Sequence, residues 1–225
     1  YAIAGIRADT GTSKIRTWTN EFGGNFEQLF QNLYSLSLSW DIPQRFITNI
    51  QSPYLYNFNK ADVRYFYWKY ENSIRSQTGQ HQPLLSSKSL FLKDTKKKFN
   101  IEHIEAQNSS ILESIVVWNP NDEGKKFKDI ALHRMGNLVL DSVSLNSAKQ
   151  DDLFWDKMIN MQFKSQFVSE NELRKWATEE NGKLIWTLDS IKKRQEHLLE
   201  FANKMWDPEN YHQGVVMEQD EGDED

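Results

Sequence analysis

Ile101-Glu102-His103-Ile104 places a carboxylate beside an imidazole in an apolar run, residues 99–104, that is typical of a strand. Gly136-Asn137-Leu138-Val139-Leu140 predicts a second strand, and Asn146-Ser147-Ala148-Lys149 follows on a helix expected to begin near Ser142. Such an order of strand, strand and helix can bring together one divalent metal ion and one general base. This half of the chain therefore indicates hydrolysis of a phosphodiester bond.

The composition is that of a folded protein without disulfide bonds. The chain has 225 residues, 13% of them aromatic, and no cysteine. This length suffices for one sizeable core or two small ones, and thiolate metal sites are excluded. No apolar run approaches the roughly 20 residues that cross a bilayer, and no signal peptide is visible. Because the chain starts at Tyr1, we expect it to be a piece of a longer polypeptide.

The net charge of -5 arises at the end of the chain. Residues 217–225 contain six of the 32 acidic residues and no base, which leaves 27 bases against 26 acids elsewhere. We expect this acidic tail to be disordered from about residue 211. The rest of the chain is less basic than most proteins that bind nucleic acid, so any DNA footprint must be a local patch.

Helical periodicity predominates outside the motifs. The clearest helix is expected after Asn59 as its cap, and its apolar stripe comprises Val63, Phe66, Tyr67, Tyr70 and Ile74. The predicted helices cover residues 25–51 with a break near Pro43, 60–75, 111–117, 151–161, a short segment around 173–176, and a long final segment capped by Thr187. Residues 1–22 show no clear period, and residues 76–90 are expected to form a loop.

His103 is the candidate general base and Glu102 the candidate metal ligand. An imidazole with an ordinary pKa near ~6.5 can take a proton from water at neutral pH. A single histidine on an apolar strand is more often structural, and the neighbouring motifs reverse that balance; for Glu102 the alternative is a glutamate facing solvent. Neighbouring residues of a strand point to opposite faces, so both can serve one site only if the strand ends or bends at His103.

Three more polar residues complete the candidate site. Asn137 would hold His103 in place, for example by donating to its backbone carbonyl, with a turn asparagine as the alternative. Asn146 would offer its carbonyl oxygen to a hard cation such as Mg²⁺, with a helix cap as the alternative. Lys149, three residues further on, shares that helical face and could contact phosphate, although exposed lysines are usually only solvated.

These motifs resemble the HNH, or ββα-metal, nuclease motif. The nine-residue step from Asn137 to Asn146, with Lys149 three further on, is also similar to the HNH domain of Cas9-type effectors. The segments that resemble the DUF1524 domain in particular are Ile-Glu-His-Ile-x-x-Gln from Ile101, Gly-Asn-Leu-x-Leu from Gly136, the run from Asn146 to Lys157, the late Trp186, Ile191 and Arg194, and Tyr67, Tyr70 and Glu71. Where that family has a proline after His-Ile-x, this chain has Ala106, which affects the turn and not the chemistry. Many HNH enzymes have an aspartate where this chain has Glu102.

The resemblance spans residues 50–207 and implies an α+β fold, predominantly helical, with a small ββα-metal motif embedded between N-terminal and C-terminal helices. We expect a helical region over residues 1–95, the nuclease core over 96–165, C-terminal helices packed on the core over 166–210, and a disordered acidic tail over 211–225.

DUF1524 forms the C-terminal half of DUF262/DUF1524 proteins, which include GmrSD-like modification-dependent restriction enzymes and SspE-like phage-defence nucleases. The resemblance therefore implies a DNA endonuclease or nickase that needs one Mg²⁺ or Mn²⁺ and acts on double-stranded DNA in bacterial anti-phage defence. It also implies a cytoplasmic protein without a membrane partner, and a preceding DUF262 domain, absent from this chain, that binds and hydrolyses nucleotide.

Basic residues near the motifs are the candidates for contact with DNA phosphates. They are Lys96, Lys97, Lys98, Lys125, Lys126 and Lys128, with Lys97 and Lys126 chosen beside Lys149. A solvated loop is at least as good an interpretation for each. Two other functions stay open: a degenerate nuclease that only docks DNA or a partner, and a helical module that regulates a larger DUF262-type protein. Nicking that depends on a metal ion would distinguish the enzyme from both.

Overall fold

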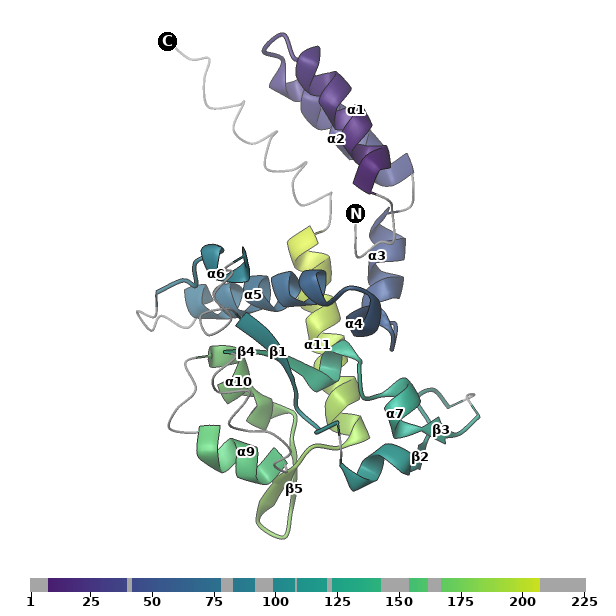
Figure 1. Cartoon of the computed structure of the whole chain (residues 1–225), viewed down its shortest axis with the longest axis vertical. Helices are drawn as coiled ribbons and strands as arrows, with labels where there is room; N and C mark the ends of the chain where they lie inside the picture. The colour runs from purple at the N-terminus through teal and green to yellow at the C-terminus, as the bar shows by residue number, and fades with distance from the viewer. Residues whose placement is uncertain are drawn as a thin grey trace, which may run out of the picture. The chain divides into compact units, whose positions relative to one another are not determined.

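The computed structural model describes residues 8–39, 42–77, 83–91, 99–107, 109–120, 123–142, 154–161 and 167–206. The chain divides into two compact units, one made of residues 1–51 and 199–225 and the other of residues 52–198. The described elements are mainly helices with small antiparallel two-stranded sheets, which confirms the predicted fold class (Figure 1). Among them, no helix combines the length and apolar character needed to span a bilayer.

The first unit contains helices α1 (Ala8–Asn20), α2 (Phe26–Ser39) and α3 (Ile42–Ile50). The sequence pattern predicts α2 and α3 but not α1. Residues 12–17 of α1 are all exposed, so this helix has little apolar stripe to reveal it. The predicted break falls where α3 begins, with Pro43 in its first turn, a position that proline tolerates.

Three helices open the second unit, namely α4 (Leu55–Phe58), α5 (Lys60–Gln77) and α6 (Lys88–Phe91). The predicted stripe of α5 is confirmed, since all five of its apolar residues are buried. Asn59 precedes this helix as predicted, and its backbone carbonyl accepts from the Val63 amide while its side chain donates to Asp62. Helix α6 overlaps the end of the segment, residues 76–90, that the sequence predicts to be a loop.

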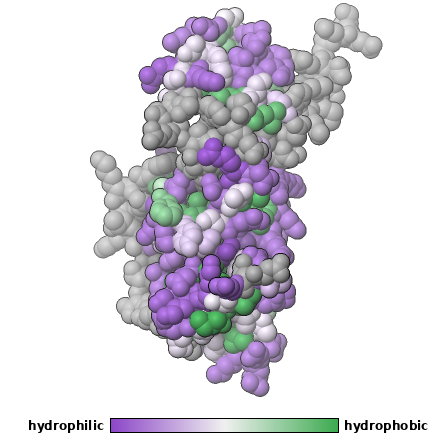
Figure 2. All heavy atoms as spheres, turned by 90° about the vertical axis from the view of Figure 1, so that its right-hand side faces the viewer, coloured by the Kyte–Doolittle hydropathy of each residue, from purple (hydrophilic) through white to green (hydrophobic). Residues whose placement is uncertain are grey.

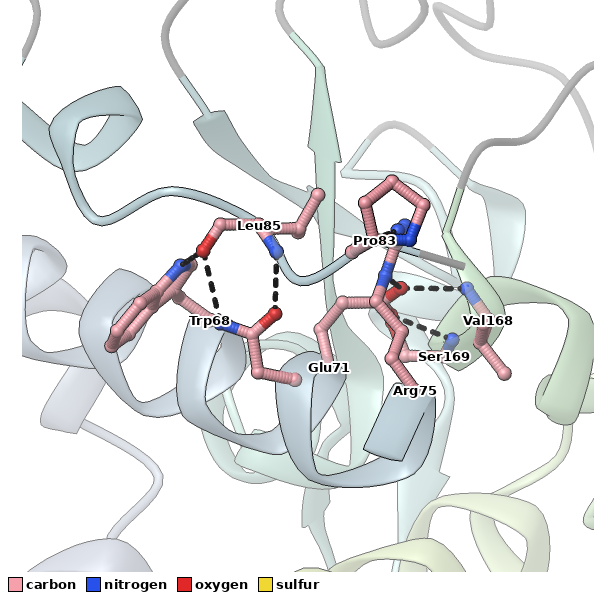
Figure 3. A network of polar contacts seen from close by, with 8 residues as sticks. Trp68, Glu71, Arg75, Pro83, Leu85, Val168 and Ser169 are labelled. Atoms are coloured by element: carbon pink, nitrogen blue, oxygen red, sulfur yellow. Dashed lines mark hydrogen bonds and ion pairs between the residues drawn. The ribbon is translucent and has the colours of Figure 1, made fainter. Parts of the chain in front are cut away.

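One face of α5 carries a buried polar network that caps another helix (Figure 3). The Glu71 carboxylate is fully buried and lies 2.6 Å from the Arg75 Nε. Its two oxygens accept the backbone N–H groups of Val168 and Ser169, each at 2.8 Å. Those amides begin α10 (Val168–Asn171), whose own preceding residue offers no side-chain cap. Glu71 therefore satisfies the free amides of a helix about a hundred residues away.

The same face of α5 also holds the chain just before α6 (Figure 3). Asn72 pairs with both backbone groups of Leu85, accepting at 2.7 Å and donating at 3.1 Å, and the Trp68 indole donates to the Leu85 carbonyl at 2.9 Å. The Arg75 guanidinium donates to the Pro83 carbonyl of the same segment at 2.9 Å. Helix α5 is thus the support on which two distant segments are fixed.

The two predicted motif strands pair with each other. Strand β1 (Phe99–His103) runs antiparallel to β4 (Leu138–Ser142), with His103 opposite Leu138 (Figure 1). The second strand begins two residues later than predicted, because Gly136 and Asn137 form a 3-10 turn, η3 (Met135–Asn137). Strand β1 ends at His103, as the candidate site requires.

The excursion between these strands contains η2 (Ser110–Glu113), β2 (Ile115–Val116), β3 (Lys125–Lys126) and α7 (Phe127–Ile130). The helix expected over residues 111–117 is therefore only a 3-10 turn followed by a strand. A run of β-branched side chains at 115–117 explains the strand. Figure 2 views the molecule from the side on which β2 and β3 lie, and its described surface is mostly hydrophilic with separate small apolar areas.

The C-terminal part comprises α9 (Phe154–Met161), α10, η4 (Glu172–Lys175), β5 (Thr178–Glu180), β6 (Lys183–Ile185) and α11 (Leu188–Trp206). The cap of α11 is confirmed: the Thr187 hydroxyl accepts from the Ser190 amide at 3.2 Å, and the Ser190 hydroxyl accepts from the Thr187 amide at 3.2 Å. The motif strand β4 and helices α7, α9 and α11 share one core, whose buried members include Ile104, Phe127, Leu132, Val139, Phe154, Met158, Leu173, Trp186 and Ile191.

Helix α11 approaches the η3 turn more closely than a side chain would allow. A Cβ atom on Gly136 would lie 2.1 Å from the Ile191 carbonyl oxygen. The Gly136 amide donates to the Gln195 side chain at 2.8 Å, and the buried Arg194 guanidinium donates to the Gly136 carbonyl at 3.1 Å. Glycine is therefore required here for close contact, and this contact positions the turn that carries Asn137.

Replacing Gly136 with alanine is expected to lower the free energy of unfolding by about 1–3 kcal/mol, because the new methyl group meets a backbone atom that cannot rotate away. Urea denaturation followed by tryptophan fluorescence measures the loss. Gly23→Ala is the matched control, since its Cβ would have nothing nearer than 4.0 Å. Equal unfolding curves for Gly136→Ala and wild type would contradict the close approach.

Candidate active site

His103 lies at the end of β1 with both ring nitrogens engaged. Its side chain is 3% exposed. The Nε2 atom lies 2.9 Å from the Nδ1 of His133, and the Nδ1 atom lies 3.0 Å from the Nε2 of Gln107. A hydrogen-bond partner at each ring nitrogen fixes the orientation of the imidazole before any ligand binds.

Burial keeps both imidazoles neutral at pH 7. Burial is the main cause that lowers the pKa of His103 to about 3, and the nearby ammonium groups of Lys157 and Lys60 act in the same direction. The pKa of His133 is also lowered, by burial and by Lys60. A neutral imidazole retains one nitrogen lone pair, which is the state that a general base needs before it accepts a proton.

Glu102 forms a buried ion pair. Its Oε1 lies 2.7 Å from the Nζ of Lys157, and the two residues are 7% and 2% exposed. The same ammonium group donates to the His103 backbone carbonyl at 3.0 Å. Lys157 thus ties α9 to the last two residues of β1, and it makes the contact with the His103 carbonyl that the sequence suggested for Asn137.

Asn137 is fully buried and joins the two chain segments that carry the histidines. Its side-chain oxygen accepts from the Glu105 amide at 3.0 Å, in the turn after His103, and its side-chain nitrogen donates to the Leu132 carbonyl at 2.8 Å. Its own carbonyl accepts from the Ile104 amide at 2.9 Å. Asn137 therefore holds the position of His103 through the backbone beside it.

Tyr56 on α4 lies near both members of the Glu102-His103 pair. Its ring meets the His103 ring edge-on, with centroids 5.0 Å apart, and stacks on His133 at 5.5 Å. The pKa of the Tyr56 phenol is raised, first by burial and then by the negative charge of Glu102. Tyr56 therefore contacts the imidazole through its ring and is influenced by the carboxylate through its charge.

The other predicted site residues do not belong to this cluster as the structure describes it. Asn146, Lys149 and Lys97, with the helix expected near Ser142, lie outside the described residues. Lys126 is exposed on β3 and pairs with Glu113 at 2.7 Å. Hydrogen bonds from Lys126 and Lys128 hold the pKa of Glu113 near 2, so this carboxylate offsets part of the local positive charge.

The proposed oxygen ligands are of the type that binds a hard divalent cation, but the described residues contain no complete set of metal ligands. Within the ranges that the structure describes, no three His, Asp, Glu or Cys side chains gather as a metal site. A carboxylate from Glu102 and an amide oxygen from Asn146 are the kind of oxygen ligands that Mg²⁺ takes. A cation at Glu102 would have to compete with the Lys157 ammonium for the carboxylate.

The sequence pattern missed His133, Tyr56 and Lys157. A signal existed for His133: it precedes β4, and in an antiparallel pair the residues before β4 return to the end of β1 that carries His103. Lys157 ends the run from Asn146 that resembles the DUF1524 domain, but nothing in that run indicates which residue it contacts. Nothing in the local sequence places Tyr56 on the histidines, because that contact joins segments about 50 residues apart.

Comparison with known families agrees with this geometry. The family described as GmrSD restriction endonucleases, C-terminal domain, matches residues 43–201, which include β1, η3, β4 and α9. No curated protein and no solved structure gives a significant match. The match confirms the resemblance inferred from the motifs around Glu102-His103 and Gly136-Asn137. The chain belongs to the family of GmrSD restriction endonuclease C-terminal domains.

Proposed function

We propose that this domain is a metal-dependent HNH endonuclease or nickase that hydrolyses phosphodiester bonds of double-stranded DNA in modification-dependent restriction of phage. The observation that carries the proposal is the buried Glu102-His103 pair at the end of β1, anchored by Asn137, in a chain of a restriction endonuclease family. The proposed setting is a bacterial protein that also carries a nucleotide-hydrolysing DUF262 domain.

His103 is the proposed general base. It takes a proton from the attacking water through the ring nitrogen that carries its lone pair, while Asn137 keeps the turn behind it in place. A pKa near 3 is low for this task. An anionic phosphate beside the imidazole favours the charged form and raises that pKa, so substrate binding brings the base nearer to its working range.

Glu102 and Asn146 are the proposed ligands of one Mg²⁺ or Mn²⁺ ion. When bound, such an ion polarises the scissile phosphate and offsets charge on the leaving oxygen. Lys157 then keeps its second contact, the His103 carbonyl, which holds the end of β1. Lys149, Lys97 and Lys126 are the proposed phosphate contacts along the DNA.

The second candidate is a catalytically degenerate module that only binds DNA or regulates its neighbour. The Glu102–Lys157 ion pair favours it, because an ammonium already neutralises the only proposed metal ligand within the described residues. This module binds DNA with an affinity that falls steeply as salt rises and counterions are released, yet it cuts nothing.

Incubation with supercoiled plasmid tests the proposal. We expect wild-type protein to nick the plasmid with Mn²⁺ or Mg²⁺ and to lose this activity on addition of EDTA, because the proposed reaction requires the cation. Gel electrophoresis of nicked and linear forms measures the rate, and filter binding at several salt concentrations measures DNA affinity in parallel. Salt-sensitive DNA binding without nicking in the presence of either metal ion would refute the proposed nuclease activity. It would support the module that only binds DNA.

A further inference from the structure

The second histidine of the cluster has a task that the proposed function leaves unassigned. His133 lies between α7 and η3, is half-buried, and meets the Nε2 of His103 at 2.9 Å. We infer that His133 is the positioning residue of the base: it accepts the Nε2–H of His103 and thereby directs the Nδ1 lone pair to the nucleophilic water. The inference rests on the proposed function and adds a residue to its machinery.

The hydrogen-bond partners determine where the proton of His103 lies. The Nε2 of Gln107 is an amide nitrogen, which donates and cannot accept, so the His103 Nδ1 beside it at 3.0 Å must be the acceptor. A neutral imidazole has one proton, and it is then on Nε2 and is donated to the His133 Nδ1. His133 in turn carries its own proton on Nε2, away from His103.

Gln107 marks the place of the water. Its exposed side chain fills the donor position on the His103 Nδ1, which is where the O–H of an attacking water would point. The other ring nitrogen, Nε2, is already occupied by its hydrogen bond with His133. Displacement of one exposed amide therefore exposes the base, whereas the contact with His133 stays.

The surroundings hold His133 in the orientation that this task requires. The Tyr56 ring stacks on His133 with 22° between the planes and meets His103 at 89°, so one aromatic ring fixes the angle between the two imidazoles. Asn137 donates to the carbonyl of Leu132, the residue before His133, and accepts from the turn after His103. Asn137 thus holds the backbone beside each histidine, and Tyr56 contacts both rings.

The hydrogen bond to His133 strengthens during the reaction. As the O–H bond of water breaks, an N–H bond forms at the His103 Nδ1 and the hydroxide attacks phosphorus; the bond from phosphorus to the leaving oxygen breaks, and that oxygen takes a proton from solvent. His103 is then a cation, and its Nε2–H donates to His133 as a charge-assisted bond. An acceptor at this position therefore stabilises the charged state more than the neutral one.

Two substitutions at His133 test the role through activity. His133→Leu removes the acceptor and is expected to lower the nicking rate at saturating DNA by about 10–100-fold with unchanged DNA affinity. His133→Asn keeps an oxygen where Nδ1 was and is expected to recover most of the lost rate. His197→Leu is the matched control, since His197 contacts Tyr70 instead of His103. Equal rates in His133→Leu and wild type, or equal loss in both His133 variants at wild-type thermal stability, would overturn the inference.

A measurement without DNA separates this inference from the proposed function. Two-bond nitrogen–proton NMR spectra of the metal-free protein report which ring nitrogen of each histidine is protonated. We expect His103 protonated at Nε2 in wild type and in His133→Asn, and a mixture of both tautomers in His133→Leu. Protonation of His103 at Nδ1 in wild type overturns the inference; the expected tautomer in a protein that never nicks DNA refutes the enzyme alone.

Discussion

Replacing His103 with alanine is expected to lower the rate of metal-dependent plasmid nicking by about 10²–10⁴-fold, the range that general-base catalysis usually provides. The imidazole is the group placed to take a proton at the end of β1, and in this cluster its neighbours Glu102 and Lys157 already engage each other. The comparison is made at saturating DNA with Mg²⁺ and again with Mn²⁺, so that a change in metal affinity is not mistaken for a lost base.

The loss must be separated from unfolding, because His103 is buried and its removal leaves a cavity. Thermal unfolding and DNA binding of His103→Ala are therefore measured beside His197→Ala, a histidine outside the cluster that contacts Tyr70. We expect both variants to remain folded and to bind DNA, with the nicking defect confined to His103→Ala. Wild-type nicking by a folded His103→Ala protein would remove His103 from the mechanism.

The candidate site was predictable where its signals are local in sequence. Glu102 and His103 are neighbours, and the sequence predicts their strand over residues 99–104, one residue longer than the strand that ends at His103. The contact predicted for Asn137, to the His103 carbonyl, is made by Lys157 instead, but a Gly-Asn pair before an apolar run does mark the start of the partner strand, where Asn137 lies. The register, with His103 opposite Leu138, then places it next to the base.

The contacts that complete the cluster join distant segments, and local patterns contain little information about them. Lys157 reaches Glu102 across 55 residues, and Tyr56 reaches His103 across 47. A lysine in a helix is usually interpreted as solvated. Only the packing of α9 against the strand pair makes Lys157 a buried partner with 2% exposure.

The fold was predictable where periodicity is strong, as in α5 and α11, and not where the signal is a turn or a weak stripe. The β5–β6 hairpin was missed even though Asn181 and Gly182, with φ of 52° and 73°, form the turn that an Asn-Gly pair favours. Strands β5 and β6 have three residues each, which is too short for an alternation of apolar and polar side chains to be recognised. Helix α1 was missed because its middle is exposed on all sides.

Replacing Glu71 with alanine is expected to lower the free energy of unfolding by about 3–5 kcal/mol, the usual result of removing one member of a buried ion pair. The change leaves the Arg75 guanidinium, 6% exposed, without the carboxylate 2.6 Å away. It also leaves the amides of Val168 and Ser169 without their acceptor at the start of α10. One substitution removes all of these interactions, because Glu71 on α5 both pairs with Arg75 and caps α10, which has no side-chain cap from its own preceding residue.

Two variants make the Glu71 measurement specific. Glu71→Gln keeps an oxygen acceptor for one of the α10 amides but loses the charge that faces Arg75, so we expect its destabilisation to fall between wild type and Glu71→Ala. Glu196→Ala, at an exposed position of α11, controls for the loss of a helical glutamate and is expected to change stability by less than about 0.5 kcal/mol. Urea denaturation curves give the three values. A Glu71→Ala midpoint within error of the Glu196→Ala midpoint would mean that the α5 network does not hold α10, and that the first turn of α10 is stabilised by solvent instead.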